Sequence, residues 1–363
     1  MNNVNNLYAS NVKCNSFLIE LTDCCPNGCN FCYNTSGIET SFLDFNDLIK
    51  IFQCAKKIGY TEIFLSGGEP FTYKYFDEAI DYCNDLSLKT TIITSFGDLL
   101  TDNLINKIID YKIGIIATLD GSNAKIHDGR RKLKCFEKTV NSIKRLHDKG
   151  FKNKMAIRCN LSYDNIDYIE DIIKFAISLK VNNITFSMLF NGGRAKDIRY
   201  LDQKHDSELL KKTGETISEL AKLYENEITV EFHSPLPYAC SHVKLLEGFD
   251  TPFSIKITND GSIFSCHMLF DKNYSLGDIK CDDLYDIIFN GKLFEQMALW
   301  KKRKESMIGC EKCKVNRFCQ GGCPAYGLSL NNNLSCQDDL CDLRRNNYLN
   351  MFGDVMRNIN NGK

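Results

Sequence analysis

The sequence predicts an α/β fold, in which six strand–helix units form an incomplete barrel that is followed by a small Cys-rich domain. Between residues 17 and 195, short apolar runs alternate with amphipathic stretches, which is typical of a parallel sheet covered by helices. Cysteines lie together near the start of the chain, three of them at positions 25, 29 and 32, and six more lie between residues 310 and 341. Clustered thiols in a chain of this length indicate metal ligands rather than a disulfide framework.

Six apolar runs are the strand candidates, and each is bounded by residues that turn the chain. They are Phe17 to Leu21, Glu62 to Leu65, Thr90 to Thr94, Ile113 to Leu119, Met155 to Leu161 and Ile184 to Leu189. Helical spacing of apolar residues lies between them, as in 48–58, 76–86 and 166–179. Gly59 follows the first of these helices and is a candidate left-handed cap. In such a barrel the active site lies on the loops at the C-terminal ends of the strands.

The rest of the chain divides into three further segments. We predict the barrel over residues 1–200, a helical linker over 201–235, a Cys-rich domain over 236–343 and a C-terminal helix over 344–363. Short hairpin-like pieces, Phe253 to Ile257 and Ser262 to Cys266, flank Asn259-Asp260-Gly261. They suit a small domain that is stabilised by metal more than by a large core.

Composition excludes several classes of protein. Of the 363 residues, 43% are hydrophobic and 25% are charged, and the formal net charge is −1. The charges are interspersed, so the sequence lacks the basic stripe of a nucleic-acid-binding protein. The first ten residues do not resemble an export signal, and no stretch approaches the ~18 apolar residues of a membrane span. We therefore expect a cytoplasmic protein with neither nucleic acid nor membrane as a partner.

The loop after the first strand carries Cys25, Cys29 and Cys32 in the spacing C-x3-C-x2-C. Three thiolates can bind three irons of a [4Fe–4S] cluster and leave the fourth iron without a protein ligand. The alternative is a zinc site that takes its fourth ligand from elsewhere in the chain.

These three cysteines, with Phe31 just before the last of them, resemble the signature of the radical S-adenosylmethionine (SAM) superfamily. The resemblance implies a partial (β/α)6 TIM-like barrel that binds SAM at the cluster, with Phe31 among the cofactor contacts. After the second strand, Gly67, Gly68, Glu69 and Pro70 are similar to the family's Gly-Gly-Glu-Pro motif. That similarity implies that this turn binds the methionine amino group of SAM.

Later loops resemble the peptide-modifying branch of the superfamily. Thr94 and Ser95 lie where relatives often carry Thr-Asn-Gly, which implies a contact with the ribose of SAM. Thr118-Leu119-Asp120-Gly121 resembles a Ser-Leu-Asp-Gly strand end and assigns Thr118 and Asp120 to the cofactor site. The alternative for each of these segments is ordinary turn chemistry.

Two further segments match the same branch. His127-Asp128-Gly129-Arg130-Arg131 resembles a His-Asp-x-x-Arg motif, in which the arginine can contact the SAM carboxylate. We assign that role to Arg131 and expect Arg130 to be solvated. Gly192-Gly193-Arg194-Ala195 after the sixth strand is also similar to the branch.

The C-terminal cysteines resemble the SPASM extension of radical SAM enzymes, which carries auxiliary iron-sulfur clusters. The resemblance implies two auxiliary [4Fe–4S] clusters, hence three in all. The ligands of the nearer cluster would be Cys240, Cys266 and Cys323, and its fourth position stays open to a free iron, His242 or an unused late cysteine. The ligands of the distal cluster would be Cys310, Cys313, Cys319 and Cys341, with Cys336 as the alternative to the last. A pair of zinc knuckles is the other interpretation of these thiols.

The resemblance implies a peptide maturase that reductively cleaves SAM to a 5′-deoxyadenosyl radical and abstracts hydrogen from a ribosomally made peptide. The product would be a cross-link or an oxidised residue. The other enzymes considered are an anaerobic sulfatase maturase that forms formylglycine, and a dehydrogenase or decarboxylase acting on a small metabolite. The non-enzymatic alternatives are an iron-sulfur carrier and a zinc-binding module.

Partners and a general base follow from the same resemblance. We expect a flavodoxin or ferredoxin as electron donor. About 15 residues precede the first strand, too few for a leader-binding domain of typical size, so a separate protein would recognise any leader peptide. His267 directly follows Cys266 and is the candidate base for product formation, unless it is merely packed or solvated.

Overall fold

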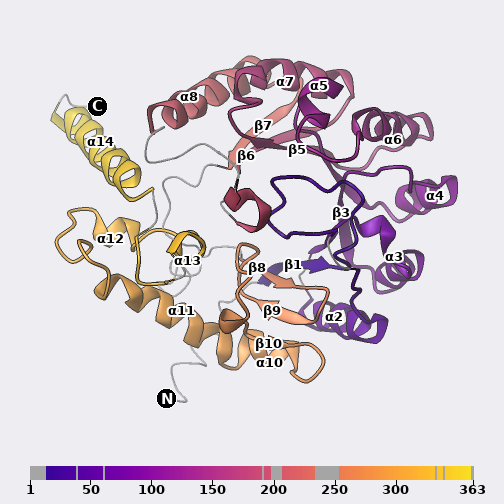
Figure 1. Ribbon diagram of the computed structural model, residues 1–363, viewed down its shortest axis with the longest axis horizontal. Coiled ribbons are helices and arrows are strands. Elements are labelled where there is room, and N and C mark those ends of the chain that lie inside the picture. The colour runs from indigo at the N-terminus through magenta and orange to yellow at the C-terminus, as the bar shows by residue number, and fades with distance from the viewer. Residues whose placement is uncertain are drawn as a thin grey trace.

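The computed structural model describes residues 14–37, 40–59, 62–189, 192–197, 207–233, 253–331, 333–337 and 340–360. Within these residues the strands form one curved sheet in the order β10-β9-β8-β1-β2-β3-β4-β5-β6-β7, with helices along its outer side (Figure 1). The strands are β1 (Cys14–Glu20), β2 (Glu62–Ser66), β3 (Lys89–Thr94), β4 (Gly114–Thr118), β5 (Met155–Leu161), β6 (Asn183–Met188), β7 (Thr229–His233), β8 (Phe253–Ile257), β9 (Ser262–Phe264) and β10 (Gly277–Asp278).

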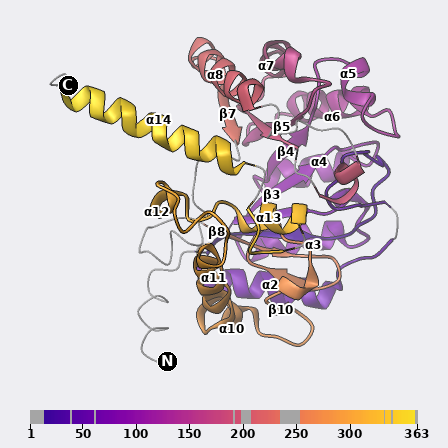
Figure 2. The ribbon, with the colours of Figure 1, turned by 60° about the vertical axis from the view of Figure 1, so that its left-hand side comes forward.

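Helices connect the parallel strands and then build the C-terminal part. Those of the barrel are α2 (Phe45–Ile58), α3 (Phe76–Asp85), α4 (Asp102–Asp110), α5 (Ala124–Asp128), α6 (Phe136–Asp148), α7 (Ile169–Ser178) and α8 (Ser207–Leu223). Those that follow are α10 (Leu284–Phe289), α11 (Lys292–Lys302), α12 (Asn316–Cys319), α13 (Pro324–Asn331) and α14 (Cys341–Asn360). Helix α14 projects away from the rest of the molecule (Figure 2). Among the described helices, none combines the length and the apolar character that crossing a membrane requires.

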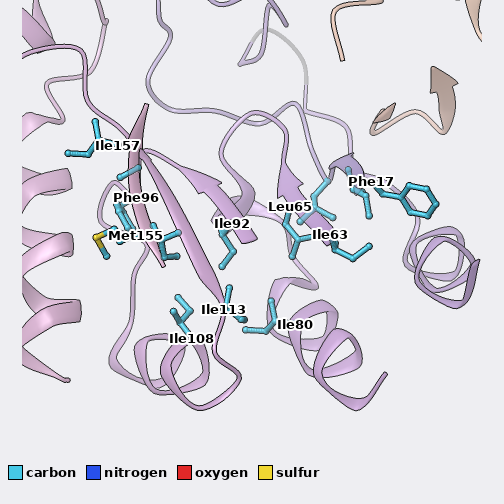
Figure 3. Close-up of a cluster of buried hydrophobic side chains, with 14 of the residues drawn as sticks. Phe17, Ile63, Leu65, Ile80, Ile92, Phe96, Ile108, Ile113, Met155 and Ile157 are labelled. Atoms are coloured by element: carbon cyan, nitrogen blue, oxygen red, sulfur yellow. The ribbon is translucent and has the colours of Figure 1, made fainter. Parts of the chain in front are cut away.

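The core lies between the outer side of the sheet and the helices. Alternate residues of each strand face it, because successive side chains of a strand point to opposite faces. Figure 3 shows Ile63 and Leu65 of β2 and Ile92 of β3 packed toward helical residues such as Ile80 and Ile108, and all five are buried. The remaining strand residues form the inner face of the barrel, which turns away from the helices.

Helix α2 begins and ends where its sequence requires. The carboxylate of Asp44 accepts hydrogen bonds from the backbone N–H groups of Asn46 and Asp47, which the helix itself leaves without partners. Gly59 ends the helix with φ of 80° and donates its N–H to the carbonyl of Ala55. The predicted left-handed cap is therefore confirmed.

All six predicted strands are present, but the sheet is larger than expected. Strand β7 follows α8 and pairs in parallel with β6, in a segment that we expected to be only a helical linker. Strands β8 and β9 form the expected antiparallel hairpin, yet β8 also pairs in parallel with β1, with Phe17 opposite Ile255. The hairpin that we assigned to a separate domain thus continues the barrel sheet. Local periodicity identifies a short strand, but it contains no information on which distant strand will be its neighbour.

Candidate active site

The three predicted cluster ligands lie on the loop that follows β1. Cys25, Cys29 and Cys32 are part-buried free thiols. Burial raises the pKa of Cys25 to about 12, and it also raises the pKa of Cys29. Without a metal these two groups are therefore protonated thiols at neutral pH, and binding of a metal must displace their protons.

The spread of these thiols fits a cluster better than a single ion. Thiolates on one tetrahedral zinc lie about 3.8 Å apart, given Zn–S bonds of about 2.3 Å. Among the described residues, the one group of three possible ligands within 4.8 Å of one another is His127, Asp128 and Cys135. At least one pair of the loop thiols is therefore more than 4.8 Å apart, which suits ligands to different irons.

The turn after β2 holds the loop that follows β1 (residues 21–37, the cluster loop) through backbone hydrogen bonds. The N–H of Gly68 donates to the carbonyl of Thr22 at 2.6 Å, and the N–H of Glu69 donates to the carbonyl of Cys24 at 2.8 Å. A Cβ atom added to Gly68 would overlap the Cys24 carbonyl, and one added to Gly67 would overlap the Thr22 carbonyl. The glycine pair is therefore required by this close approach, and Pro70, after Glu69, begins a short 3-10 turn.

Glu69 is fully buried and accepts hydrogen bonds from the end of β3. One carboxylate oxygen accepts the hydroxyl of Thr94 at 2.6 Å, and the other accepts both the N–H and the hydroxyl of Ser95 at 2.9 and 2.8 Å. Burial raises the pKa of Glu69, although these hydrogen bonds oppose the effect. The structure thus brings together three predicted cofactor residues, and Thr94 and Ser95 direct their hydroxyls at Glu69.

Arg131 connects Cys29, a predicted cluster ligand, to the end of β4. Its Nη1 donates to Cys29 Sγ at 2.7 Å, and its Nη2 pairs with the buried carboxylate of Asp120. Asp120 also accepts the N–H of Asn160 at 2.8 Å. Burial alone would raise the pKa of Asp120, but Arg131 and its neighbours hold that pKa below the usual value. Thr118, at the end of β4, is half-buried on the inner face.

Phe31 lies against two guanidinium groups. The Cζ atoms of Arg130 and Arg131 lie 4.3 and 5.3 Å from its ring centroid, within the range of a cation–π contact. Arg130 is only 4% exposed, and its Nη1 donates to the carbonyl of Asn160 at 2.7 Å. Our expectation of a solvated Arg130 was wrong, because the ring of Phe31 and the end of β5 enclose its side chain.

Arg194 is a residue of the site to which the sequence assigned no role. Its backbone N–H donates to Cys32, its Nε donates to Cys29 at 2.7 Å, and its Nη1 donates to Ser36 at 2.9 Å, in each case to a carbonyl oxygen. One side chain thus binds the backbone of the cluster loop along much of its length. The available signal was an arginine directly after a glycine pair at a strand end.

His127 is buried beside Arg131. Its Nδ1 accepts the N–H of Asp120 at 3.0 Å, and its Nε2 lies 3.3 Å from Cys135 Sγ and 3.1 Å from Arg131 Nε. Burial and the neighbouring charge of Arg131 lower the pKa of His127 to about 4. The imidazole is therefore neutral at physiological pH.

This lowered pKa predicts a loss of stability in mild acid. Between pH 6.5 and 4 the unfolded chain binds a proton at His127 that the folded chain does not, so folding becomes less favourable as the pH falls. We expect about 1 kcal/mol of folding free energy to be lost between pH 7.5 and 5.5 through this residue. Urea unfolding at both pH values would measure it. His127→Gln keeps a hydrogen-bond acceptor for the backbone N–H of Asp120, and its free energy of unfolding should depend less on pH. An unchanged pH dependence would show that His127 is not the group responsible.

Four of the late cysteines line one cavity. Cys310, Cys313, Cys319 and Cys341 surround it together with Met307, Gln337 and Arg344. Cys336 is not among the lining residues, and its backbone carbonyl lies against Gly327 instead. The first turn of α14 brings Cys341 to the other three thiols.

The structure describes two of the expected ligands of the nearer auxiliary cluster. Cys266 and Cys323 both pack against one apolar cluster that contains Phe264 and Trp300, whereas Cys240 and His242 lie outside the described residues. His267 is exposed. Met268 and Phe270 line an open cleft beside the cluster loop, but His267 does not. The role of His267 as a base therefore stays a prediction.

An open cleft joins the cluster loop to the C-terminal part. With its mouth it encloses about 1100 Å³ of empty space. Residues 33–36 of the cluster loop, residues 258–260 of the hairpin turn and residues 325, 328 and 329 of α13 line it. The ring of Tyr33 lies 5.2 Å from the ring of Phe270, centroid to centroid, and joins the two walls.

Two family models match the chain. Residues 19–176 match the Radical SAM superfamily, and residues 251–314 match SPASM, an iron-sulfur cluster-binding domain. PqqA peptide cyclase of Methylocella silvestris is 23% identical over 339 residues, which cover 90% of this chain and 87% of the relative. A PqqA peptide cyclase of Xanthomonas oryzae pv. oryzae is 22% identical over 341 residues, with the same coverage.

Solved structures share the fold. Streptococcus suis SuiB bound to precursor peptide SuiA superposes with a TM-score of 0.71 at 17% identity, over 90% of this chain and 75% of that one. Native anSMEcpe with bound AdoMet gives a TM-score of 0.70 at 18% identity, over 96% of this chain and 100% of that one. The loop thiols, the glycine turn that holds them, the late cysteines and the two model matches lead to one conclusion. The chain is a SAM-dependent iron-sulfur enzyme of the radical SAM superfamily and carries a C-terminal SPASM domain.

Proposed function

We propose that this enzyme modifies a ribosomally made peptide that lies extended in the cleft between the cluster loop and the SPASM domain. The cleft is the observation that carries the proposal. It is open, it has both polar and apolar walls, and it begins at Tyr33, directly after Cys32. It also reaches Ala325, two residues after Cys323. Relatives named for a peptide substrate, PqqA peptide cyclase and the SuiB–SuiA complex, support this class of substrate.

The residues of the site have distinct tasks in this proposal. Cys25, Cys29 and Cys32 would hold a [4Fe–4S] cluster, which together with bound SAM supplies a 5′-deoxyadenosyl radical for hydrogen abstraction. Arg194 and the Gly-Gly turn fix the backbone of the cluster loop. The buried Glu69 offers its carboxylate, oriented by Thr94 and Ser95, to the SAM amino group. Rigid positioning matters because a radical that is not aligned with its substrate is lost to side reactions.

Phe31, Thr118, Asp120 and Arg131 complete the proposed SAM site. Phe31 presents an apolar ring beside the cluster loop. Asp120 fixes Arg131 in a position to neutralise negative charge at the cluster and at the SAM carboxylate. Thr118 adds a hydroxyl on the inner face.

The proposal includes two auxiliary [4Fe–4S] clusters. Cys240, Cys266 and Cys323 would hold the nearer one, and the four thiols of the C-terminal cavity would hold the distal one. These clusters would accept the electron that the substrate radical loses when it is oxidised. A flavodoxin or ferredoxin would supply electrons to the first cluster, and a separate protein would present any leader peptide. A reducing cytoplasm, in which thiols stay free to bind iron, suits all three clusters.

The cavity predicts which late cysteine is a cluster ligand. Cys341→Ser should lower the iron content by up to about four per chain, because one cluster loses a thiolate. Cys336→Ser is the matched control and should leave the iron content unchanged. Iron and sulfide analysis after anaerobic reconstitution measures both variants. Loss of iron in Cys336→Ser alone would instead assign Cys336 as the ligand.

Product analysis tests the function itself. The reconstituted enzyme would be incubated without oxygen with SAM, a reductant and the short peptides encoded beside its gene. We expect 5′-deoxyadenosine together with a peptide whose mass shows the loss of hydrogens. Conversion of a sulfatase cysteine or serine to formylglycine would favour the maturase alternative. Formation of 5′-deoxyadenosine with turnover of a small metabolite alone would reject a peptide substrate, and absence of SAM cleavage would reject the radical mechanism.

A further inference from the structure

Arg158 is a charged side chain on the inner face of the barrel that the proposed mechanism does not use. Its neighbours in β5, Ile157 and Cys159, are buried in the core against the helices. Because side chains alternate along a strand, Arg158 lies on the opposite face. It is paired in register with Thr118 of β4 and Thr185 of β6. This position lies near the C-terminal ends of the strands, at the level of the proposed SAM site.

The guanidinium of Arg158 has no counterion among the described residues. Its Nε is buried without a hydrogen-bond partner. In the same row of the sheet, the next carboxylate belongs to Glu231, two strands away, and it accepts the hydroxyl of Thr185 at 3.2 Å. Burial lowers the pKa of Arg158, and the phenol of Tyr33 opposes this effect only in part. The charge of Arg158 in turn helps to lower the pKa of His233 on β7.

The guanidinium of each of the other arginines of the site makes at least one hydrogen bond to a described residue, whereas that of Arg158 makes none. Arg131 pairs with Asp120, Arg130 donates to the carbonyl of Asn160, and Arg194 donates to carbonyl oxygens of the cluster loop. Arg158 is part-buried, and a charge without a partner in such a position destabilises the fold. An arginine kept under this penalty at a site of chemistry is expected to bind an anion that arrives from outside.

We propose that Arg158 binds the carboxylate of an acidic side chain of the peptide substrate. This inference rests on the proposed function, because it requires a peptide in the barrel. Guanidinium groups bind carboxylates with two parallel hydrogen bonds, which gives both affinity and orientation. Tyr33 lines the cleft and is 38% exposed, and its phenol interacts electrostatically with Arg158. The proposed SAM site assigns the SAM carboxylate to Arg131, which contacts Cys29, and leaves Arg158 to the substrate.

Two pools of capped eight-residue peptides test this assignment. One pool carries Glu at a fixed central position, the other carries Gln there, and all other positions are randomised. Both would be offered with SAM to the immobilised holoenzyme, and the retained peptides would be measured by mass spectrometry. We expect the wild type to enrich the Glu pool at least about tenfold, Arg158→Met to lose the preference and Arg158→Lys to keep part of it. Arg145→Met, which removes a surface arginine of α6, is the matched control.

Two further measurements separate the other outcomes. Arg158→Met should raise the melting temperature, because it removes an unpaired, part-buried charge, whereas a structural role would lower it. The Kd of SAM, measured by equilibrium dialysis, should change less than about twofold. If Arg158→Met bound SAM ten times more weakly, Arg158 would be the partner of the SAM carboxylate, and the proposal would be overturned. An unchanged preference for Glu in Arg158→Met would also overturn it. Because these are binding measurements, they remain informative even if no peptide product is ever found.

Discussion

Replacing Cys25, Cys29 and Cys32 together by alanine is expected to abolish formation of 5′-deoxyadenosine. In the proposed mechanism, reductive cleavage of SAM depends on the iron that these thiolates would leave open, and no other part of the chain would substitute for them. Iron should fall by about four per chain from about twelve, because the auxiliary clusters have their own ligands. The measurements are iron and sulfide content and product analysis by chromatography under anaerobic conditions.

Cys24→Ala is the control for this triple variant. Cys24 is the adjacent cysteine, it lies outside the C-x3-C-x2-C spacing, and its contact with the Gly-Gly turn is made by its backbone carbonyl. The single variant should keep its iron and its SAM cleavage. Zinc in place of iron, or a triple variant with undiminished SAM cleavage, would disprove the assignment of the cluster to this loop.

The second large effect is expected from Asp120→Asn. Asp120 is fully buried and balances the charge of Arg131, while it also accepts the N–H of Asn160. Its neutralisation leaves the guanidinium without a counterion inside the protein, which typically costs about 3–5 kcal/mol. We expect a correspondingly lower midpoint in denaturant unfolding and weaker binding of SAM, because Arg131 loses its fixed position.

Two variants test the cause of that loss. Asp102→Asn removes a surface pair with Arg145 and should have little effect, because solvent screens exposed charges. The double variant Asp120→Asn with Arg131→Met should recover part of the lost stability, since it removes the unbalanced charge. A double variant less stable than Asp120→Asn would show that the ion pair is not the source of the effect.

The sequence predicted what depends on local spacing. The C-x3-C-x2-C pattern places three thiols on one loop independently of the rest of the fold. The apolar period of each β-strand identifies the strand itself. The three thiols do lie on the loop after β1, and the six predicted strands are present. The Gly-Gly turn could also be predicted, because two glycines in succession at a strand end permit close approach of another segment.

Features that depend on contacts between distant residues could not be predicted. Arg194 binds the carbonyl of Cys29, 165 positions earlier in the chain, and no local pattern relates the two. The same holds for the choice between Cys341 and Cys336. The spacing of either cysteine allows it to be a cluster ligand, and only the position of α14 shows that Cys341 lines the cavity. The unpaired state of Arg158 is a property of the inner face as a whole, which exists only after the strand order is fixed.

The pairing of β1 with β8 has a consequence for how the chain folds during synthesis. Strand β1 begins at Cys14, but its partner β8 begins only at Phe253. At roughly 5–20 residues per second, the ribosome releases β8 some 10–50 s after β1. During that interval β1 is an uncovered sheet edge, a template for aggregation, and it stands beside a loop of three unligated thiols. Any fragment that ends before residue 253 keeps this state permanently, so expression of the barrel alone should give aggregated protein.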